Sequence, residues 1–282
     1  MNSLQANNGT PAVGRTGSAL LETVAALTRF VDHDSRPEDV VSTVRTWAER
    51  LCGRIAPDAS ALNRLRMLNH FFFDELGFHG ERGQADEDGA DAGYLHRVIE
   101  RRAGIPDCLS LLYMEIGRAI GLRLCGVAFA GSFLVKLDCN SRVLVIDVSE
   151  RGTTLSAQQL RSKLAIGSQE ASAVAGDDTL QQCLRGMSED DFLLRILRGI
   201  GQRHRAAGQW EAALAVQSQL IERLPDSRRE RLARAEIYER LECPRAAADD
   251  LEQCLRGSPH AADAGGIRRR YLSLRRQASR LN

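Results

Sequence analysis

A repeat with a period of 34 residues most constrains what the last third of this chain can fold into. Pro225 and Pro259 each follow an apolar helical segment and lie 34 positions apart. Small residues, which paired helices need where they touch, recur at the same shift: Gly201 and Ala213, then Ala235 and Ala247. A period of this length predicts stacked helical hairpins, each of which buries one face against the next.

The period is that of the tetratricopeptide repeat. Helix starts and stops between the repeats agree with it, because caps, glycine and proline fall at the expected boundaries. We predict about two repeats and a capping helix over residues 188–282, with helices at 192–207, 209–224, 227–241, 244–256 and 267–281.

The first part of the chain has a different pattern. Apolar residues recur at helical spacing up to Gly121, and then alternate with a period of two. Pro37 fits the first turn of one helix, with Asp34 or Ser35 as its expected cap. The alternating segments predict a small antiparallel sheet, with strands near 127–130, 133–135 and 143–146. The fold class is therefore α+β and mostly helical.

Composition shifts divide the chain into four parts. We expect a flexible tail at 1–17, a helix-and-strand domain at 18–165, a linker at 166–187 and the repeat domain at 188–282. The segment 78–93 is rich in glycine and acidic residues. We expect it to be an exposed loop, because it has almost nothing apolar to bury. Its carboxylates could suggest a calcium site, but their spacing does not match a calcium-binding EF-hand loop.

Charge and cysteine content exclude several classes of protein. Lys and Arg number 38 against 37 Asp and Glu, so the chain as a whole gives no electrostatic reason to bind nucleic acid or a membrane. Seven cysteines without C-x-x-C spacing argue against a disulfide framework or a zinc site. With no signal-like or membrane-length apolar run, we expect a cytoplasmic protein without metal or cofactor.

One stretch of the first domain carries a family resemblance. The run from Gly93 to Leu137 is GYLHRVIERRAGIPDCLSLLYMEIGRAIGLRLCGVAFAGSFLVKL, and VLVIDVSERGTTLS follows it. It resembles the transglutaminase-like (papain-like) domain of the bacterial SirB-type proteins, whose pattern is close to SYLNRVLERRxGIPxSLSxLYLEVARRLGLxVxGVxxPGHFLVR. That family also ends in tetratricopeptide repeats. The resemblance thus covers nearly everything after the tail.

The resemblance implies a Cys-His-Asp site that this chain lacks in part. Cys108 is the available thiol, and Asp147 stands on the later strand. Ser132 occupies the position of the family's His, and Ala130 that of the preceding Pro. A serine hydroxyl cannot act as a base near neutral pH. The position of the nucleophile is also open, since counting back from Gly121 places it nearer Pro106.

Each of these three residues has a simpler explanation. Cys108 in the first turn of a helix is either a thiol with a lowered pKa or a small buried core residue. Asp147 is either a remnant of the triad or a strand-end carboxylate that accepts backbone hydrogen bonds. An active enzyme would need an imidazole from elsewhere, and His70, His79 and His96 are the candidates. The i,i+3 pair Glu115 and Arg118 is expected to be a weak surface ion pair.

The repeat domain offers a basic stripe on the first helix of each pair. Its members are Arg195, Arg198, Gln202, Arg205, Arg228, Arg231 and Arg234. The stripe predicts an acidic peptide or a C-terminal carboxylate as ligand, or else a solvated face, or packing against the first domain. Arg268–Arg270, Arg275 and Arg276 lack the aromatic residues of a nucleic-acid site, and we expect no nucleic acid there.

The sequence therefore favours a non-catalytic adaptor or regulatory protein that binds a protein or peptide through its repeats. The alternative is a cysteine-dependent amide hydrolase or acyl transferase that uses Cys108. A third class, a structural subunit of a larger assembly, would expose a large apolar patch. Oligomeric state and the partner's identity are not encoded in any motif.

Overall fold

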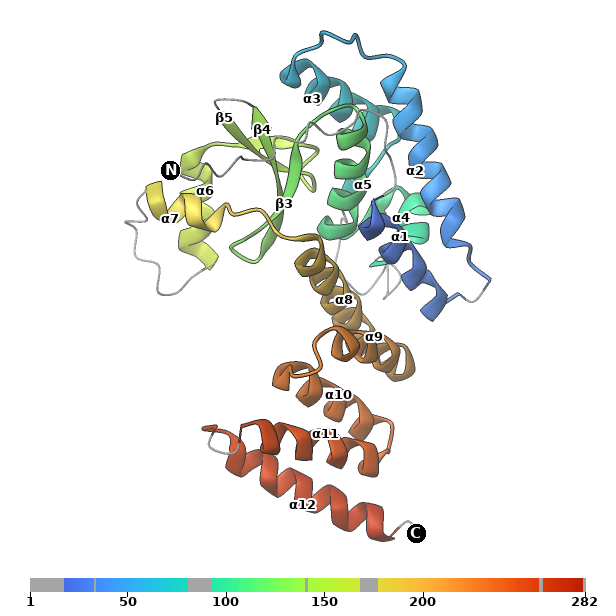
Figure 1. Ribbon diagram of the computed structural model, residues 1–282, viewed down its shortest axis with the longest axis vertical. Helices are drawn as coiled ribbons and strands as arrows, with labels where there is room; N and C mark the ends of the chain where they lie inside the picture. Colours follow the sequence, from blue (N-terminus) through green and yellow to red (C-terminus); the bar gives the residue numbers. More distant parts are fainter. Residues whose placement is uncertain are drawn as a thin grey trace, which may run out of the picture. The chain divides into compact units, whose positions relative to one another are not determined.

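The computed structural model describes residues 18–32, 34–80, 93–139, 142–167, 177–258 and 261–280 (Figure 1). The predicted tail, most of the acidic loop and Pro259 lie outside these residues. Contacts divide the chain into two units. Within the described residues, the first unit contains 18–26, 36–80 and the described part of 95–189. The second contains 27–35, 93–94 and the described part of 190–282.

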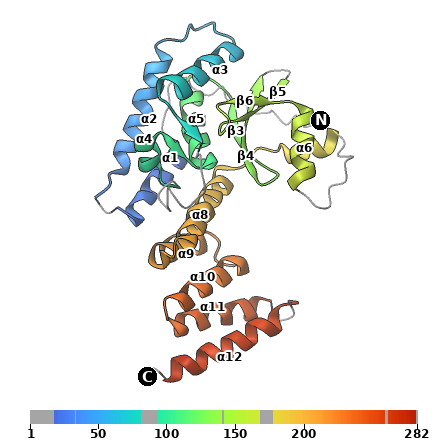
Figure 2. The same cartoon turned by 180° about the vertical axis from the view of Figure 1, so that it is seen from behind.

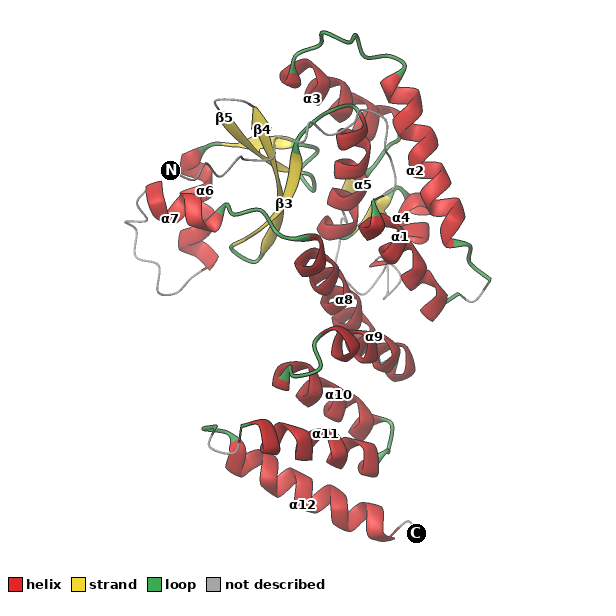
Figure 3. Ribbon diagram, in the orientation of Figure 1, coloured by secondary structure: helices red, strands yellow, loops and turns green. Residues whose placement is uncertain are grey.

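The first unit combines helices with a small sheet (Figure 3). Its helices are α1 (Ala19–Ala26), α2 (Pro37–Cys52), α3 (Ala61–Asn69) with the π-helical turn η2 (His70–Glu75), α4 (Leu95–Arg101), α5 (Pro106–Ala119), α6 (Ala157–Gly167) and α7 (Asp177–Cys183). Helix α7 lies within the segment that the sequence analysis treats as a linker.

Two helix starts illustrate how local sequence positions these elements. Pro37 occupies the first turn of α2, as predicted, because its fixed φ suits that position. The predicted cap is wrong: Arg36 is the residue before the helix, and no side chain caps it. Ser60 does cap α3, where its hydroxyl accepts the amide of Asn63 at 3.3 Å.

The main sheet is antiparallel, in the order β3-β4-β5-β6, with strands β3 (Leu124–Phe129), β4 (Ser132–Cys139), β5 (Arg142–Asp147) and β6 (Thr153–Leu155). The alternating pattern predicted the first three strands, whereas β6 is too short to show one. A separate parallel pair joins β1 (His79–Gly80) to β2 (Ala103–Gly104), directly before α5.

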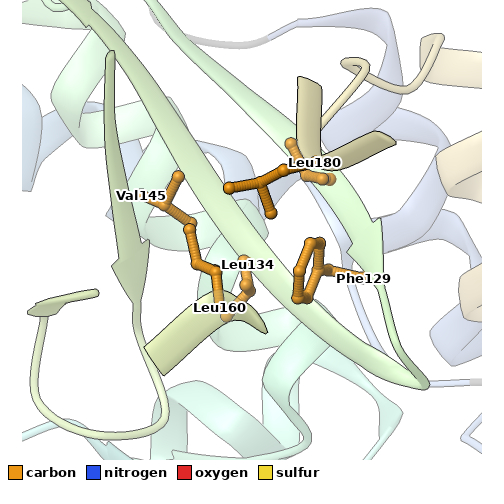
Figure 4. Close-up of a cluster of buried hydrophobic side chains, with 6 residues drawn as sticks. Phe129, Leu134, Val145, Leu160 and Leu180 are labelled. Atoms are coloured by element: carbon orange, nitrogen blue, oxygen red, sulfur yellow. The ribbon is translucent and has the colours of Figure 1, made fainter. Parts of the chain in front are cut away.

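Each face of the main sheet is covered by different helices. Leu124 points toward α5, since a Cβ added to Gly117 would lie 2.4 Å from its Cδ1. On the opposite face, Val127, Phe129, Leu134 and Val145 pack with Leu160 of α6 and Leu180 of α7 (Figure 4). We call these two sides the α5 face and the α6 face.

The second unit consists of antiparallel helix pairs. It contains the 3-10 turn η1 (Leu27–Phe30), α8 (Glu189–Ala206), α9 (Trp210–Arg223), α10 (Arg228–Arg240), α11 (Pro244–Gly257) and α12 (Ala264–Arg280). Helix α11 packs between α10 and α12, and the three lie side by side in Figures 1 and 2. The small residues singled out from the repeat register, Gly201, Ala213, Ala235 and Ala247, are all buried.

Candidate functional site

The three residues implied by the family resemblance come to one end of the main sheet. Strand β4 begins at Ser132 and antiparallel β5 ends at Asp147, so both lie at this end. Strand β1 lies between the start of α5 and this end of the sheet. Beside α5, a Cβ on Gly80 would lie 3.0 Å from the carbonyl oxygen of Ser149, just after β5. The first turn of α5, which carries Cys108, is thereby brought near the end of β5.

Strand geometry separates the residues onto different faces. Successive side chains of a strand point to opposite faces, so Ser132 shares the α6 face with Leu134, and Asp147 shares it with Val145. Helix α5 covers the opposite face. Ser132 and Asp147 are therefore on one side of the sheet, and the helix that carries Cys108 packs on the other.

The turn before Ser132 explains part of this arrangement. Ala130 and Gly131 join β3 to β4 with φ values of +47° and +80°, a two-residue hairpin turn. Proline fixes φ near −65°. The family's pattern, which has proline where Ala130 stands, cannot make this turn. The two departures from the pattern, Ala130 and Ser132, therefore belong to a single local change.

Asp147 is almost fully buried, and its carboxylate already has partners. Its Oδ1 accepts the amide of Ser149 at 3.2 Å, and its Oδ2 lies 3.4 Å from Nζ of Lys163 on α6. The hydrogen bond from the Ser149 amide fixes the turn after β5, and the ion pair with Lys163 holds α6 on the sheet. No sequence signal pointed to Lys163, because its pairing depends on how α6 docks.

Cys108 is fully buried in the first turn of α5. Pro106 begins this helix, and Ile105 before it supplies no side-chain cap. The helix N-terminus favours a thiolate electrostatically, but a thiol with no exposed surface reacts only when the surrounding chain opens. Among the described side chains, no cluster of three or more His, Cys, Asp or Glu could hold a metal ion.

His79 is one candidate base, and it lies close to the start of α5. It stands on β1, beside the strand that leads into α5, and its Nδ1 lies 3.0 Å from the carbonyl oxygen of Gly80. A carbonyl can only accept, so Nδ1 carries a proton, and in the neutral ring the lone pair is on Nε2. His70 is exposed, and its Nδ1 lies 3.0 Å from Oδ2 of Asp74. This surface pair does not make it a candidate base for Cys108.

In the repeat unit, most of the predicted basic stripe is paired with acidic residues of the same unit. Arg198 bonds the buried Glu230 at 2.9 Å, and Arg228 pairs with Asp263. Arg231 and Arg234 both pair with Asp250 of α11, and the hydrogen bond that Arg234 donates to Asp250 raises the pKa of the Arg234 guanidinium. Sequence reasoning missed these pairs because Glu230 and Asp250 do not recur with the 34-residue period.

The remaining members of the stripe lie on α8. Gln202 is exposed, and Arg195 and Arg205 are half-buried. Elsewhere in the unit, a pocket of about 580 Å³ opens between the end of α10, the start of α11 and α12. Its lining is mixed, with Pro244 and Leu274 beside Glu239, Glu242 and Arg270. In the part of the chain that the structure describes, no helix has the length and apolar content needed to cross a membrane.

Comparison with known proteins agrees with this architecture. The chain is 26% identical to a UPF0162 protein of Xylella fastidiosa over 259 residues, which cover 90% of this chain and 89% of the relative. It is 33% identical to a UPF0162 protein of Pseudomonas aeruginosa over 161 residues, 57% of each. It is also 28% identical to human F-box only protein 21 over 149 residues, which are 50% of this chain and 23% of that protein.

Two family profiles cover most of the sequence. A tetratricopeptide repeat profile matches residues 200–271. The profile of the transglutaminase-like superfamily matches residues 38–198, more than half of the chain. The prediction of a transglutaminase-like domain followed by tetratricopeptide repeats is confirmed, and the chain belongs to the transglutaminase-like superfamily.

Proposed function

We propose that this chain is a non-catalytic adaptor or regulatory protein of the SirB type. In this proposal the repeat unit binds a protein or peptide partner, and the transglutaminase-like domain has lost its catalytic role. The observation that carries it is Ser132, a residue without a usable base, at the position of the family's His. Tetratricopeptide repeats, which present helix surfaces to protein ligands, support the binding role.

Two further features support the loss of catalysis. Among the residues that the structure describes, the Asp147 carboxylate contacts Lys163 and the Ser149 amide, and no imidazole bonds to it. Cys108, the only thiol in the implied triad, is fully buried. A nucleophile must reach its substrate, and an orienting carboxylate must reach the base, so this arrangement favours structural roles for both residues.

The test compares binding with thiol chemistry in the same protein. Partner capture by the full chain, followed by reconstitution with the purified partner, should succeed for wild type and for Cys108→Ser. It should fail for at least one charge variant of the repeat unit, either Gln202→Glu/Arg205→Glu on α8 or Arg269→Glu/Arg276→Glu on α12. Loss of binding in Cys108→Ser, or retention in both repeat variants, would contradict the proposal.

One observation favours a second candidate, a cysteine-dependent amide hydrolase or acyl transferase. His79 stands on β1 next to the start of α5, and the bond to Gly80 leaves its Nε2 as a free base. If His79 activates Cys108, the thiol should react with iodoacetamide with an apparent pKa well below the ordinary value of about 8.5.

The labelling experiment separates the two candidates. Wild type, Cys108→Ser and His79→Gln are labelled across the pH range around neutrality, and modification of each cysteine is quantified by mass spectrometry. The adaptor proposal expects Cys108 to label only on unfolding. Rapid labelling of Cys108 that His79→Gln abolishes would instead establish the thiol enzyme.

A further inference from the structure

Helix α12 carries several arginines and no acidic residue of its own. Its sequence, AGGIRRRYLSLRRQASR, contains six arginines. The whole chain has a formal net charge of only +1. Helix α12 thus carries a local excess of positive charge, although the chain as a whole is nearly neutral.

The arginines of α12 lie at different positions around the helix. Ala264, Ile267 and Leu274 are buried, and this side packs on α11. Arg269, Leu272, Arg276 and Arg280, at spacings of three and four residues, form one stripe on the opposite side. All four are exposed, and Leu272 keeps 45% of its surface accessible. We call this stripe the outward face of α12.

Ion pairs on α12 involve arginines outside the outward face. Arg270 bonds Glu239 of α10 at 2.6 Å, and Arg275 bonds Glu252 of α11 at 3.1 Å. Within the described residues, Arg269, Arg276 and Arg280 have no carboxylate partner. The outward face therefore differs from the stripe on α8 and α10, where Glu230 and Asp250 neutralise the arginines.

We propose that the outward face of α12 binds an acidic amphipathic helix of a partner protein. This inference rests on the proposed function, since it names the surface and the chemistry of the partner. In a repeat array each helix is covered by the next, and a helix in that position would meet the outward face. Over the about 16 Å from Arg269 to Arg280, carboxylates at matching spacing would pair with the arginines. An apolar side chain would cover Leu272.

Other occupants fit this surface less well. A second copy would place identical arginine faces against each other, and their like charges would repel. An anionic membrane requires more apolar surface than one exposed leucine provides. Single-stranded nucleic acid needs aromatic side chains for stacking, and this face has none. The carboxylates of Glu239 and Glu242 in the adjoining pocket would also repel phosphates.

The test uses the full chain and a defined probe. The probe is a fluorescent helical peptide with glutamates at the spacing of the three arginines and a central leucine, and its control has glutamine in place of glutamate. Binding is followed by anisotropy for wild type and for Arg269→Glu/Arg276→Glu. The matched control is Arg229→Glu/Arg245→Glu, which makes the same charge change on exposed arginines of α10 and α11.

The α12 variant should weaken binding of the glutamate peptide by about tenfold or more, while the matched control changes it by less than about twofold. The glutamine peptide should bind weakly to all three proteins. Equal losses in both variants would mean a response to net charge alone and would overturn the proposal. The proposal would also be overturned if an oligonucleotide or anionic vesicles bound more tightly than the peptide, and if this binding depended on Arg269 and Arg276 in the same way.

Binding measurements with the physiological partner distinguish failure of the α12 proposal from failure of the adaptor proposal. If a purified partner binds wild type and the α12 variant equally, the outward face is not its site, and the proposed function stands. If the peptide binds as expected but no partner binds the repeat unit, the proposed function fails, whereas the assignment of the outward face as a binding surface for acidic helices stands.

Discussion

Glu115 of α5 accepts hydrogen bonds from both the backbone amide and the hydroxyl of Ser18, which stands 97 residues earlier in the chain. The distances are 3.1 Å to the amide nitrogen and 2.7 Å to the hydroxyl oxygen. Only 3% of Glu115 is exposed, so the prediction of a weak surface pair with Arg118 is wrong. Ser18 also caps α1, since its hydroxyl accepts the amide of Leu21. The buried carboxylate thus fixes the start of α1 on α5.

Replacing this carboxylate should destabilise the first unit. Glu115→Ala removes the carboxylate that accepts from the Ser18 amide and hydroxyl, as well as one partner of Arg118, and we expect a loss of about 2–3 kcal/mol in the free energy of unfolding. Ser18→Ala should cost about 1 kcal/mol, as for other caps. Urea denaturation measures both. Glu22→Ala, an exposed change on α1, is the control, and equal effects of Glu115→Ala and Glu22→Ala would contradict the role of Glu115.

Two glycine-to-alanine substitutions should have opposite signs. At Gly117 a Cβ would lie 2.4 Å from Leu124 and 2.9 Å from Leu68, so alanine overpacks the contact of α5 with the sheet. We expect a loss of about 1–3 kcal/mol. At Gly266 of α12 a Cβ meets nothing within 4 Å, and alanine should stabilise by up to about 1 kcal/mol. Thermal melting of both variants tests the packing, and stabilisation by Gly117→Ala would refute it.

Glu230 should be the most sensitive acidic residue of the repeat unit. It is buried and accepts bonds from Arg198 at 2.9 Å and from Gln217 at 2.8 Å, which joins α8 and α9 to α10. Glu230→Ala should cost about 2–4 kcal/mol, because Arg198 and Gln217 both lose the carboxylate that accepts their hydrogen bonds. Glu236→Ala removes an exposed carboxylate from the same helix and should change stability by less than about 0.5 kcal/mol. Similar losses in the two variants would exclude a bridging role.

Glu75 should make stability depend on pH in the acid range. Hydrogen bonds from Arg54 and Arg50 lower the pKa of its carboxyl group below the ordinary value. A carboxyl group whose pKa is lower in the folded state stabilises the fold at pH values above its pKa in the unfolded chain, about 4.3. This stabilisation is lost as the pH falls through the pKa of the folded state. Glu75→Gln should therefore melt lower than wild type at neutral pH, and the gap should close in acid. A gap that widens on acidification would contradict this sign.

Local features of the fold could be predicted because they depend on neighbouring residues. Pro37 in the first turn of α2 follows from its fixed φ, and the period of 34 residues follows from a helical pattern that repeats along the chain. The alternation that marks β3, β4 and β5 is equally local. The family resemblance then gave the order of the two domains, which the profile matches confirm.

The candidate site could be predicted only in part. The sequence alone predicted that Cys108 lies in the first turn of a helix, because this is a matter of local periodicity, whereas the family resemblance implies that Ser132 stands where a base is expected. Only the tertiary structure decided that Asp147 pairs with Lys163 and that Asp250 neutralises Arg234, since burial and charge pairing arise where distant segments pack. Such contacts depend on how helices dock on a sheet or on one another, and no short stretch of sequence encodes that docking.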